Sequence, residues 1–342
     1  MKAVVLREIG PAENLKLEDA PRPEVTPGHV LVRVRAAGVC YRDIVDRRGG
    51  FPYMKSPVVP GHEFAGEVVE LGEGVVGRHV GDRVVNLHRP PCGVCQYCRA
   101  GHEPRCTSSL YAFGLTVDGG YAEYVLAPAG CLVPLPDEIA FQHGCFLACT
   151  AGVALRALRV RAAVREGETV LVTGASGGVG LHALQVARLL GARTLAVTSS
   201  PAKVDALRAA GADDVLVATG DLAFHKEVKR RTGAGVDVAL DCVGAPTLNS
   251  SLRSLRAMGR VVVIGNVTME RAEINAGLMI LNELSAAGSS GCSRDDLLQV
   301  IAWVRDKRLE PKLAQVLPLA SAVEAHRRLE AKGVAGRLVL AP

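Results

Sequence analysis

Short apolar runs separated by glycine and proline dominate the first 145 residues of the chain. Examples are Val30–Val34, Phe64–Leu71 and Arg83–Asn86, and turn-forming pairs such as Pro27-Gly28 stand between such runs. Apolar runs of this length, bounded by turn signals, are typical of β-strands. This part of the chain is therefore predicted to be an irregular, mostly β domain with long loops.

The pattern changes near residue 150, where apolar strands begin to alternate with helical segments. Strands are predicted at Thr169–Thr173, Thr194–Thr198, Val215–Val217, Val236–Asp241 and Arg260–Ile264. Helices are predicted at Gly180–Leu190, Ala202–Ala210 and around Thr247–Leu255. Such alternation indicates an α/β domain with a doubly wound parallel sheet. Further on, residues 294–308 are predicted to be helical and Arg337–Leu340 to form a final strand.

The length of 342 residues favours more than one domain, because single cores rarely grow beyond about 250–300 residues. We place a β-rich domain at residues 1–149 and the doubly wound domain at 150–290. The C-terminal part, 291–342, is assigned to the first domain.

Composition and charge exclude several classes of protein. Apolar residues make up 49% of the chain and charged residues 22%, as in ordinary globular proteins. The net charge of +5 is spread along the chain without a basic run, so no nucleic-acid partner is expected. The N-terminal apolar run is too short for a signal peptide, and no stretch approaches the ~18–20 apolar residues that span a bilayer. We expect a cytoplasmic protein without a membrane partner, in which the ten cysteines are thiols or metal ligands.

Four of the cysteines are closely spaced. Cys92, Cys95, Cys98 and Cys106 form the pattern C-x2-C-x2-C-x7-C. Four thiolates this close in sequence can surround one tetrahedral zinc ion. With no open coordination position, such a zinc would be structural and would stabilise a loop that lacks an apolar core of its own.

The chain also contains the segments GVCYRD, with Cys40, and PGHEF, with His62 and Glu63, and it reaches Cys149 just before the doubly wound domain. This order of motifs resembles the zinc-dependent alcohol dehydrogenases of the medium-chain dehydrogenase/reductase family over nearly the whole chain. The resemblance implies a GroES-like catalytic domain and a Rossmann domain. It also implies a catalytic zinc on Cys40, His62 and Cys149, with Glu63 able to approach the metal and Asp43 supporting the site.

A glycine-rich loop follows the first strand of the predicted doubly wound domain. It reads VTGASGGVG and opens a helix, the context in which such a loop binds the pyrophosphate of a dinucleotide. The predicted contacts are Ser176, Gly177, Gly178 and Val179. Ala175 stands where a strict GxGxxG motif has its first glycine, a form that resembles quinone and enoyl reductases of the same superfamily.

The end of the second strand predicts which nicotinamide cofactor binds. NAD enzymes usually place a carboxylate there, whereas this chain has Thr198, Ser199, Ser200 and, one turn later, Lys203. Three hydroxyls and an ammonium favour the 2′-phosphate of NADPH. Ser200 also suits an N-cap ahead of Pro201, and both interpretations can hold together. By resemblance, Val243, Gly265 and Asn266 flank the nicotinamide and its ribose, and the neighbouring Cys242 is interpreted as a packing residue.

Arg42 departs from the alcohol dehydrogenase pattern. Those enzymes typically carry a serine or threonine two residues after the first zinc cysteine, which passes the alcohol proton toward solvent. A guanidinium is always protonated and cannot accept that proton. The segments CYRD, LACTAG and VTGASGGVG resemble the acryloyl-CoA reductase branch, which reduces short 2-enoyl-CoA esters with NADPH. Acryloyl-CoA and 3,3-dimethylacryloyl-CoA are the candidate substrates.

This resemblance implies hydride transfer to Cβ and stabilisation of the enolate oxygen by zinc or a hydrogen-bond donor. Tyr41, beside the metal ligand, is the candidate proton donor; water is the alternative, and Tyr41 is equally a wall of the pocket. Tyr41, Arg42 and Asp43 are thus the candidate catalytic residues. Cations that could bind CoA phosphates are Arg42, Arg47, Arg48 and Lys55.

Three other functions are compatible with parts of this pattern. A zinc-dependent alcohol dehydrogenase or carbonyl reductase shares every motif except the hydroxyl relay. Quinone reductases generally lack both zinc sites. A non-catalytic crystallin-like or nucleotide-binding protein would not need intact ligands and an intact phosphate loop.

A homodimer or homotetramer is expected, with Leu278–Gly288 as the candidate sheet edge for pairing.

Overall fold

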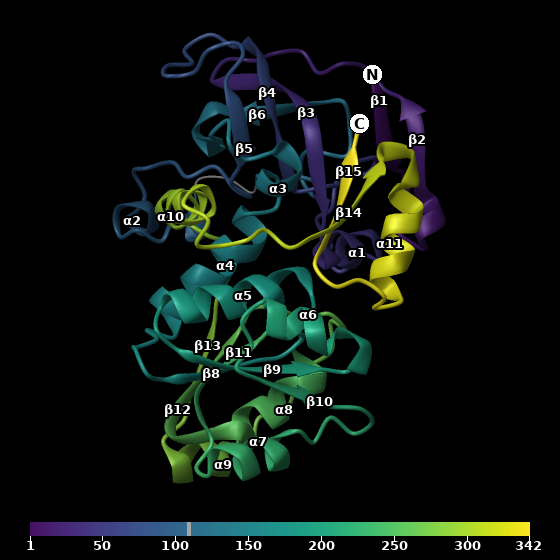
Figure 1. Ribbon diagram of the computed structural model, residues 1–342. Helices are drawn as coiled ribbons and strands as arrows, with labels where there is room; N and C mark the ends of the chain where they lie inside the picture. The colour runs from purple at the N-terminus through teal and green to yellow at the C-terminus, as the bar shows by residue number, and fades with distance from the viewer. Residues whose placement is uncertain (108–110) are drawn as a thin grey trace. The chain divides into compact units, whose positions relative to one another are not determined.

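The computed structural model describes residues 1–107 and 111–342, which form two compact units (Figure 1). Unit 1 comprises Met1–Cys149, Gly291–Lys307 and Pro311–Pro342, and unit 2 comprises Thr150–Ser290 and Arg308–Glu310. The C-terminal part of the chain thus returns to the unit that the N-terminal part begins, apart from a three-residue segment that packs with unit 2.

Unit 1 is built on a sheet whose strands follow the order β14-β15-β3-β4-β5-β7, with β6 paired to β3. All pairs are antiparallel except β14 and β15, which run parallel, and β1 and β2 form a separate antiparallel pair. Strand β3 has neighbours on both sides, and most of its residues are buried, with Arg33 and Arg35 exposed. The strands are β1 (Lys2–Leu6), β2 (Leu15–Asp19), β3 (His29–Val39), β4 (Glu63–Leu71), β5 (Arg83–Asn86), β6 (Tyr124–Pro128), β7 (Leu132–Pro134), β14 (Leu313–Pro318) and β15 (Arg337–Ala341).

The helices of unit 1 lie in the connections between strands, and most of them are short, although one of them has 12 residues. They are α1 (Tyr41–Arg47), α2 (Gln96–Arg99), α3 (Phe141–Gly144), α10 (Arg294–Arg305) and α11 (Ala322–Glu330). The helix predicted at 294–308 is confirmed, although it ends three residues early. Its start is fixed by a capping box, in which Ser293 N donates to Asp296 Oδ2 at 2.9 Å and Asp296 N donates to Ser293 Oγ at 3.2 Å.

Unit 2 is a six-stranded, fully parallel sheet with the order β10-β9-β8-β11-β12-β13. The order reverses direction beside β8, which is the switch point of a doubly wound sheet. The strands are β8 (Thr169–Val172), β9 (Arg193–Thr198), β10 (Asp214–Val217), β11 (Val236–Asp241), β12 (Leu255–Val263) and β13 (Ser285–Gly288). The helices are α4 (Val153–Leu155), α5 (Gly178–Leu189), α6 (Val204–Ala209), α7 (His225–Thr232), α8 (Ala245–Ser254) and α9 (Ala276–Asn282).

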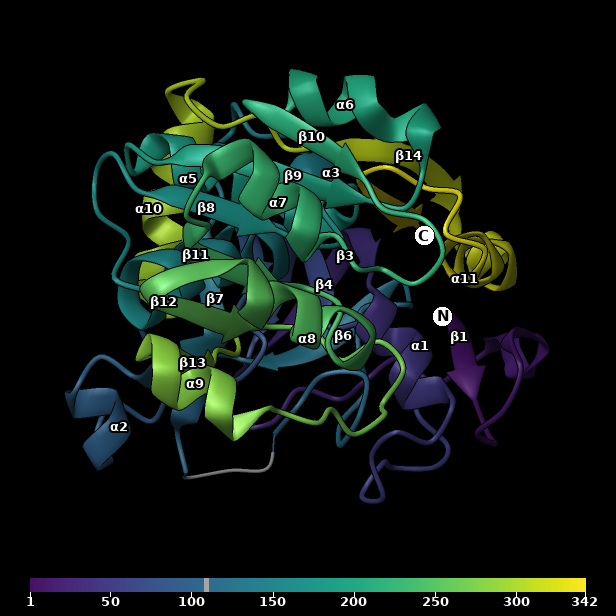
Figure 2. The same cartoon turned by 90° about the horizontal axis from the view of Figure 1, so that it is seen from below.

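Helices cover both faces of this sheet. Helices α5 and α6 lie on one face, and α7, α8 and α9 lie on the other (Figure 1); the view from below places α7 and α8 in front of the strands (Figure 2). Buried side chains of the strands and of α7 and α8 form the core on this second face, among them Leu171, Val197, Val228, Leu252 and Val261. The α/β fold class predicted from the sequence, a β-rich unit joined to a doubly wound unit, is confirmed.

The segment 278–288 differs from the expected sheet edge. Residues Ala276–Asn282 form helix α9, and only Ser285–Gly288 form the edge strand β13, paired with β12. A helix begins here because the Asn275 side chain caps it, accepting a hydrogen bond from Leu278 N at 3.0 Å. Within the described ranges, no helix combines the length and apolar character needed to cross a bilayer.

Candidate metal and cofactor sites

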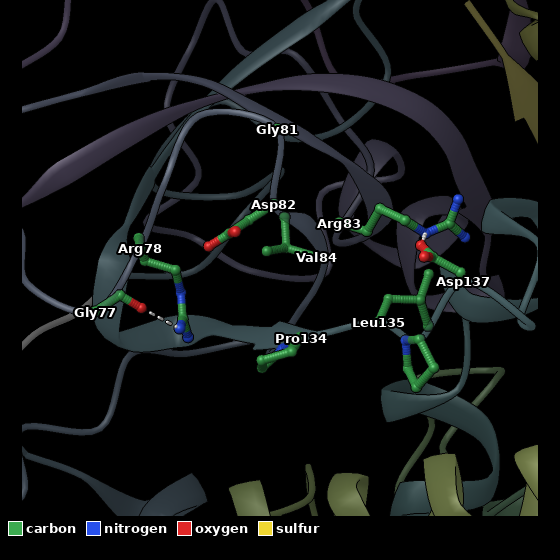
Figure 3. A pocket seen from close by; sticks show the side chains of 10 residues that line it. Gly77, Arg78, Gly81, Asp82, Arg83, Val84, Pro134, Leu135 and Asp137 are labelled. Carbon is green, nitrogen blue, oxygen red and sulfur yellow. Dashed lines mark hydrogen bonds and ion pairs between the residues drawn. The ribbon is translucent and has the colours of Figure 1, made fainter.

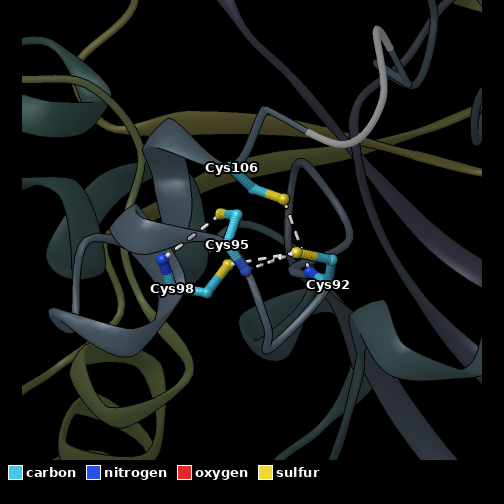
Figure 4. Close-up of side chains that lie close together, drawn as sticks. All are labelled: Cys92, Cys95, Cys98 and Cys106. Atoms are coloured by element: carbon cyan, nitrogen blue, oxygen red, sulfur yellow. Dashed lines mark hydrogen bonds between the residues drawn. The ribbon is translucent and has the colours of Figure 1, made fainter.

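The four closely spaced cysteines of unit 1 converge on one point (Figure 4). Cys95 caps helix α2, and its sulfur accepts a hydrogen bond from Cys98 N at 3.5 Å. Cys92 Sγ accepts from Cys95 N at 3.3 Å, and Cys106 Sγ accepts from Cys92 N at 3.4 Å. Backbone N–H groups thus point at three of the four sulfurs, those of Cys92, Cys95 and Cys106, which favours the thiolate form that binds metals.

The spacing of the sulfurs fits a tetrahedral zinc ion. All four ligand atoms lie within 4.8 Å of one another, and Cys92 Sγ and Cys98 Sγ are 3.9 Å apart. Four sulfurs at ~2.3 Å from one zinc would be about 3.8 Å apart, so the lobe has the size that this metal requires.

The second cluster brings together Cys40, His62, Glu63 and Cys149, again within 4.8 Å. Cys40 lies between β3 and α1, while His62 and Glu63 lie at the start of β4. The pairing of β3 with β4 sets Gly38 opposite Glu63 and so draws the two segments together. His62 Nε2 and Cys149 Sγ are 3.3 Å apart.

Asp43 fixes the orientation of the His62 ring. Its Oδ1 lies 2.7 Å from His62 Nδ1, which leaves Nε2 directed at the cluster, and its Oδ2 accepts from Cys40 N at 2.9 Å. Asn86 holds the backbone on the other side, because its Nδ2 donates to His62 O at 2.9 Å and its Oδ1 accepts from Phe64 N at 2.8 Å. A carboxylate behind a ligating histidine is the usual way to select its tautomer.

Glu63 is buried without a hydrogen bond. Neither carboxylate oxygen has a partner of this kind in the described part of the chain, although Arg337 approaches Oε1 to 2.9 Å at an angle that makes none. A Cβ on Gly38 would lie 2.1 Å from Glu63 Oε2, so only glycine permits this close approach. A buried carboxylate whose oxygens accept no hydrogen bond from the described residues, beside two thiols and an imidazole, is a donor set suited to a metal ion.

The electrostatics of this cluster favour a bound cation. Burial opposes protonation of His62, yet the negative charges of Asp43 and Cys40 outweigh burial and raise the His62 pKa to about 10. Burial raises the pKa of Glu63 to about 8. A hydrogen bond from Cys149 lowers the pKa of Cys40 well below its usual range. The raised His62 pKa shows that negative charge is concentrated around this ring. A divalent cation that displaces the His62 proton would be stabilised by the same negative charge and bound by the same side chains.

A buried network, absent from the sequence predictions, continues behind Asp43. Tyr121 Oη donates to Asp43 Oδ2 at 3.1 Å and lies 3.4 Å from His326 Nε2. Arg47 Nε donates to His326 Nδ1 at 3.4 Å, and the same guanidinium contacts Gly10 O and the Glu330 carboxylate. Contacting partners in this network lie up to 283 positions apart in the chain, and no short motif links them.

Arg42 is held beside the metal cluster. Its Nε lies 3.0 Å from Asp46 Oδ2, and its Nη1 lies 2.6 Å from His88 Nε2. The His88 ring in turn contacts the His62 ring edge-on, with centroids 5.0 Å apart. The half-buried Tyr41 makes no hydrogen bond with the described residues, so its hydroxyl is available.

All four cations expected to bind substrate phosphates have partners within the protein, Arg42 through Asp46 and His88. Arg47 is 1% exposed and belongs to the buried network, so its expected role in binding phosphates is wrong. Arg48 pairs with Glu330 at 2.8 Å, and Lys55 pairs with Asp118 at 3.1 Å.

The glycine-rich loop of unit 2 follows β8 and opens α5. Gly177 is the N-cap of α5, so the first N–H groups of the helix, at Gly178 and Val179, point out of its N-terminus beside Ser176. A Cβ on Gly180 would lie 2.5 Å from Ala175 Cα, which shows how closely the helix packs against the loop. These are the features that a pyrophosphate site requires.

The strand beside this loop, β9, ends in hydroxyl side chains rather than a carboxylate. Thr198 is buried and its Oγ1 accepts from Ser200 N at 3.2 Å, whereas Ser199 is exposed. Ser200 stands at the N-cap position of the short 3-10 helix Pro201–Lys203, but its side chain makes no capping hydrogen bond. Lys203 lies at the end of that turn, and burial lowers its pKa.

The loops after β11 and β12 lie at the same edge of the sheet, because all its strands run parallel. Val243 packs against the glycine-rich loop, since a Cβ on Gly174 would lie 2.9 Å from Val243 Cγ2. Val267 N donates to Val243 O at 2.9 Å, which draws the segment with Gly265 and Asn266 toward it. The structure thus brings the predicted cofactor residues to one edge of unit 2.

Asp241, which sequence reasoning did not single out, organises this edge. Its buried carboxylate accepts hydrogen bonds from Gly244 N at 2.8 Å, Thr247 Oγ1 at 2.8 Å and Ser251 Oγ at 2.5 Å. These bonds fix the loop that carries Val243 and begin helix α8.

A surface pocket of about 470 Å³ lies elsewhere on unit 1, between residues 77–84 and 134–137 (Figure 3). Arg83 pairs with Asp137 at 3.2 Å, and Arg78 donates to Gly77 O at 2.9 Å and to Leu132 O at 2.6 Å. The pocket shares no residue with either metal cluster, and its cations already have partners.

Comparison with known proteins relates both units to oxidoreductases. Residues 26–137 match the alcohol dehydrogenase GroES-like domain, and residues 178–306 match the zinc-binding dehydrogenase family. An acryloyl-coenzyme A reductase of Metallosphaera sedula is 38% identical over 99% of both chains.

Solved structures show the same relationship. The structure of AibC is 46% identical and has a TM-score of 0.93, with 100% of this chain and 96% of that chain covered. A cobalt- and zinc-bound thermostable alcohol dehydrogenase from Pyrobaculum aerophilum is 33% identical and has a TM-score of 0.89, with 100% and 99% covered. The chain therefore belongs to the zinc-binding, alcohol dehydrogenase-like medium-chain dehydrogenases/reductases and is an oxidoreductase.

Proposed function

We propose that this protein reduces the C=C bond of a short 2-enoyl-CoA thioester, of the acryloyl-CoA or 3,3-dimethylacryloyl-CoA type, with NADPH. The observation that carries the proposal is the position of Arg42 and its pairing with two neighbouring side chains. Arg42 stands where an alcohol dehydrogenase needs a hydroxyl relay, and it is fixed by Asp46 at 3.0 Å and His88 at 2.6 Å. A paired guanidinium offers no path for an alcohol proton, whereas a positive charge near the metal cluster suits the enolate that forms when an enoyl thioester is reduced.

The reduction adds a hydride at Cβ and a proton at Cα, and it oxidises NADPH to NADP⁺. Bound NADPH would supply the hydride, and a zinc ion on Cys40, His62 and Cys149 would supply a Lewis acid. Asp43 holds the His62 ring in place through the 2.7 Å contact. The Tyr41 hydroxyl, which has no partner among the described residues, is the proposed proton donor to Cα.

The cofactor proposal rests on the end of β9. The exposed Ser199 stands where a carboxylate would select NADH, and Lys203 follows in the next turn. Ser199→Asp should raise KM for NADPH at least about tenfold and lower KM for NADH, because the carboxylate repels the 2′-phosphate and accepts from the ribose hydroxyls. Unchanged KM values for both cofactors would contradict the assignment.

The central experiment measures NADPH oxidation by purified protein with two panels, short enoyl-CoA esters and simple aldehydes or ketones, with and without a zinc chelator. We expect turnover of the enoyl-CoA esters and none of the carbonyl compounds. Turnover of aldehydes with inert CoA esters would refute the proposal.

The second candidate is a zinc-dependent alcohol dehydrogenase or carbonyl reductase. It is favoured by the metal cluster, whose ligand types are shared with that class, and by the 33% identity to a zinc-bound alcohol dehydrogenase. Arg42→Thr separates the two candidates. For an enoyl reductase the change lowers kcat, whereas for an alcohol dehydrogenase it restores a relay hydroxyl and raises alcohol oxidation.

We further propose a homodimer formed through the edge of unit 2. Among the described residues, strand β13 pairs with β12 and with no other strand, and the neighbouring helix α9 exposes Ile280 (74%) and Leu281 (85%). Exposed apolar residues beside an open strand edge are typical of a pairing surface. Leu281→Glu should shift the protein toward monomer in sedimentation velocity, and an unchanged sedimentation coefficient would exclude this surface.

A further inference from the structure

Arg89 is a half-buried cation with no counter-charge in the described part of the chain. Its side chain has no hydrogen-bond or ion-pair partner among the residues that the structure describes. Arg89 directly follows His88 in the chain, and the His88 ring contacts both Arg42 and the metal-cluster residue His62. Arg89 is therefore next in sequence to a residue that packs against the metal cluster. A guanidinium in this position normally finds a carboxylate or carbonyl, as Arg47 and Arg337 do.

The neighbours of Arg89 add positive charge instead of removing it. Burial lowers the Arg89 pKa, and the charges of Arg42 and Arg105 lower it further. Arg105 ends the short 3-10 helix Glu103–Arg105 in the four-cysteine lobe, and it is exposed. Asp46 already pairs with Arg42, so it does not neutralise the other two. Keeping such a cluster together costs free energy that a bound anion would recover.

Two aromatic rings lie beside this cluster. Phe51 and Tyr53 pack at a tilt with centroids 5.8 Å apart, and Arg42 stands over the Phe51 ring at 5.8 Å. Tyr53 is 51% exposed, and it lies close enough to Arg89 to influence the Arg89 pKa. An exposed aromatic ring next to unpaired guanidinium groups combines a stacking surface with phosphate ligands, which are the two elements that recognise a phosphorylated nucleoside.

We infer that Arg89 and Arg105 bind the phosphates, and Tyr53 the adenine, of the nucleotide part of an acyl-CoA substrate. The inference rests on the proposed function and names the part of unit 1 that recognises the CoA moiety. Arg89 and Arg105 take the place of the cations that the sequence predicted as ligands of the CoA phosphates, because Arg47, Arg48 and Lys55 have partners within the protein. This site also gives the four-cysteine lobe a role, because the fold of that lobe sets the position of Arg105.

Direct binding tests the site without turnover. Free CoA and dephospho-CoA are titrated calorimetrically into the full-length, zinc-loaded protein saturated with NADPH, so that the cofactor site is occupied. Arg89→Gln should raise Kd for CoA about 10- to 100-fold, as expected for the loss of charge-assisted hydrogen bonds. The matched control is Arg22→Gln, since Arg22 is an exposed arginine of the same unit that pairs with Glu70; its Kd should equal that of the unaltered protein.

Further variants distinguish a phosphate ligand from a general effect on folding. Arg89→Lys keeps the charge and should recover part of the affinity, whereas Tyr53→Ser should weaken CoA and dephospho-CoA equally. No binding of CoA by the unaltered protein, or an equal Kd for the Arg89→Gln variant, would overturn the inference.

Kinetics separate this inference from the proposed function. The same enoyl group is offered as a CoA thioester and as a pantetheine thioester, which lacks the nucleotide. Arg89→Gln should raise KM for the CoA ester alone. If the unaltered protein reduces neither thioester, the proposed function fails. If it reduces both and the variant changes both KM values equally, or neither, the nucleotide site fails while the reductase function stands.

Discussion

Arg47→Met tests whether this arginine is a structural residue, as the buried network indicates, or a substrate ligand. The Arg47 guanidinium is 1% exposed and contacts Gly10 O, His326 and the Glu330 carboxylate. Methionine keeps most of the apolar volume, so the change removes the charge and its hydrogen bonds with little loss of packing.

The expected cost follows from burial. Breaking a buried ion pair on one side destabilises proteins by about 3–5 kcal/mol. Glu330 is 21% exposed and would still pair with Arg48 at 2.8 Å after the change. The expected loss in the free energy of unfolding is therefore near the lower end of that range, at about 3 kcal/mol. Arg48 binds the same carboxylate but is 48% exposed, so Arg48→Met should cost at most about 1 kcal/mol.

The assay is equilibrium unfolding in urea of the zinc-loaded protein and the two variants, followed by KM for an enoyl-CoA ester. We expect Arg47→Met to unfold at clearly lower urea, with KM unchanged in the folded fraction. If Arg47→Met is as stable as Arg48→Met and KM rises instead, the network is not what holds Arg47, and the residue is the substrate ligand that the sequence suggested.

Four further predictions concern the metal sites and the network. Tyr121→Phe removes the 3.1 Å hydrogen bond to Asp43, and zinc affinity measured by chelator competition should fall about 10- to 100-fold; equal affinity would show that Asp43 needs no such support. Gly38→Ala places a Cβ 2.1 Å from Glu63 Oε2, so zinc bound at the second cluster, counted by atomic emission, should be reduced while the four-cysteine site stays filled. Cys98→Ser should cost one zinc per chain and make residues 92–106 the first site of limited proteolysis; a full zinc count would contradict the four-thiolate assignment. Burial lowers the pKa of His326 to about 4, below its value of ~6.5 in an unfolded chain, so the stability that the neutral ring contributes is present above pH ~6.5 and is lost as pH falls toward 4. His326→Gln should flatten that part of the stability profile, and an unchanged profile would assign the acid sensitivity to other groups.

Local patterns in the sequence were sufficient for the fold class and for the sites whose residues are close together. The alternation of apolar strands and helices after residue 150 predicts a parallel sheet, because each element must bury one face. The C-x2-C spacing predicts a four-cysteine cluster, because four soft ligands within one short lobe can reach a common ion. The segment around α9 shows the limit of such patterns, since a short apolar run fits a strand or a helix and here the Asn275 cap favours the helix.

Tertiary structure alone decided which charged residues have partners. The sequence does not distinguish Arg47, Arg48 and Arg89 from one another. In the structure, Arg47 is buried against Glu330, and Arg48 pairs with the same carboxylate at the surface. Arg89 has no anionic partner among the described residues. The residues behind the second metal cluster, Tyr121 and His326, are 205 positions apart. Charge pairing depends on distances of a few ångströms between segments remote in the chain, and sequence order carries no record of those distances.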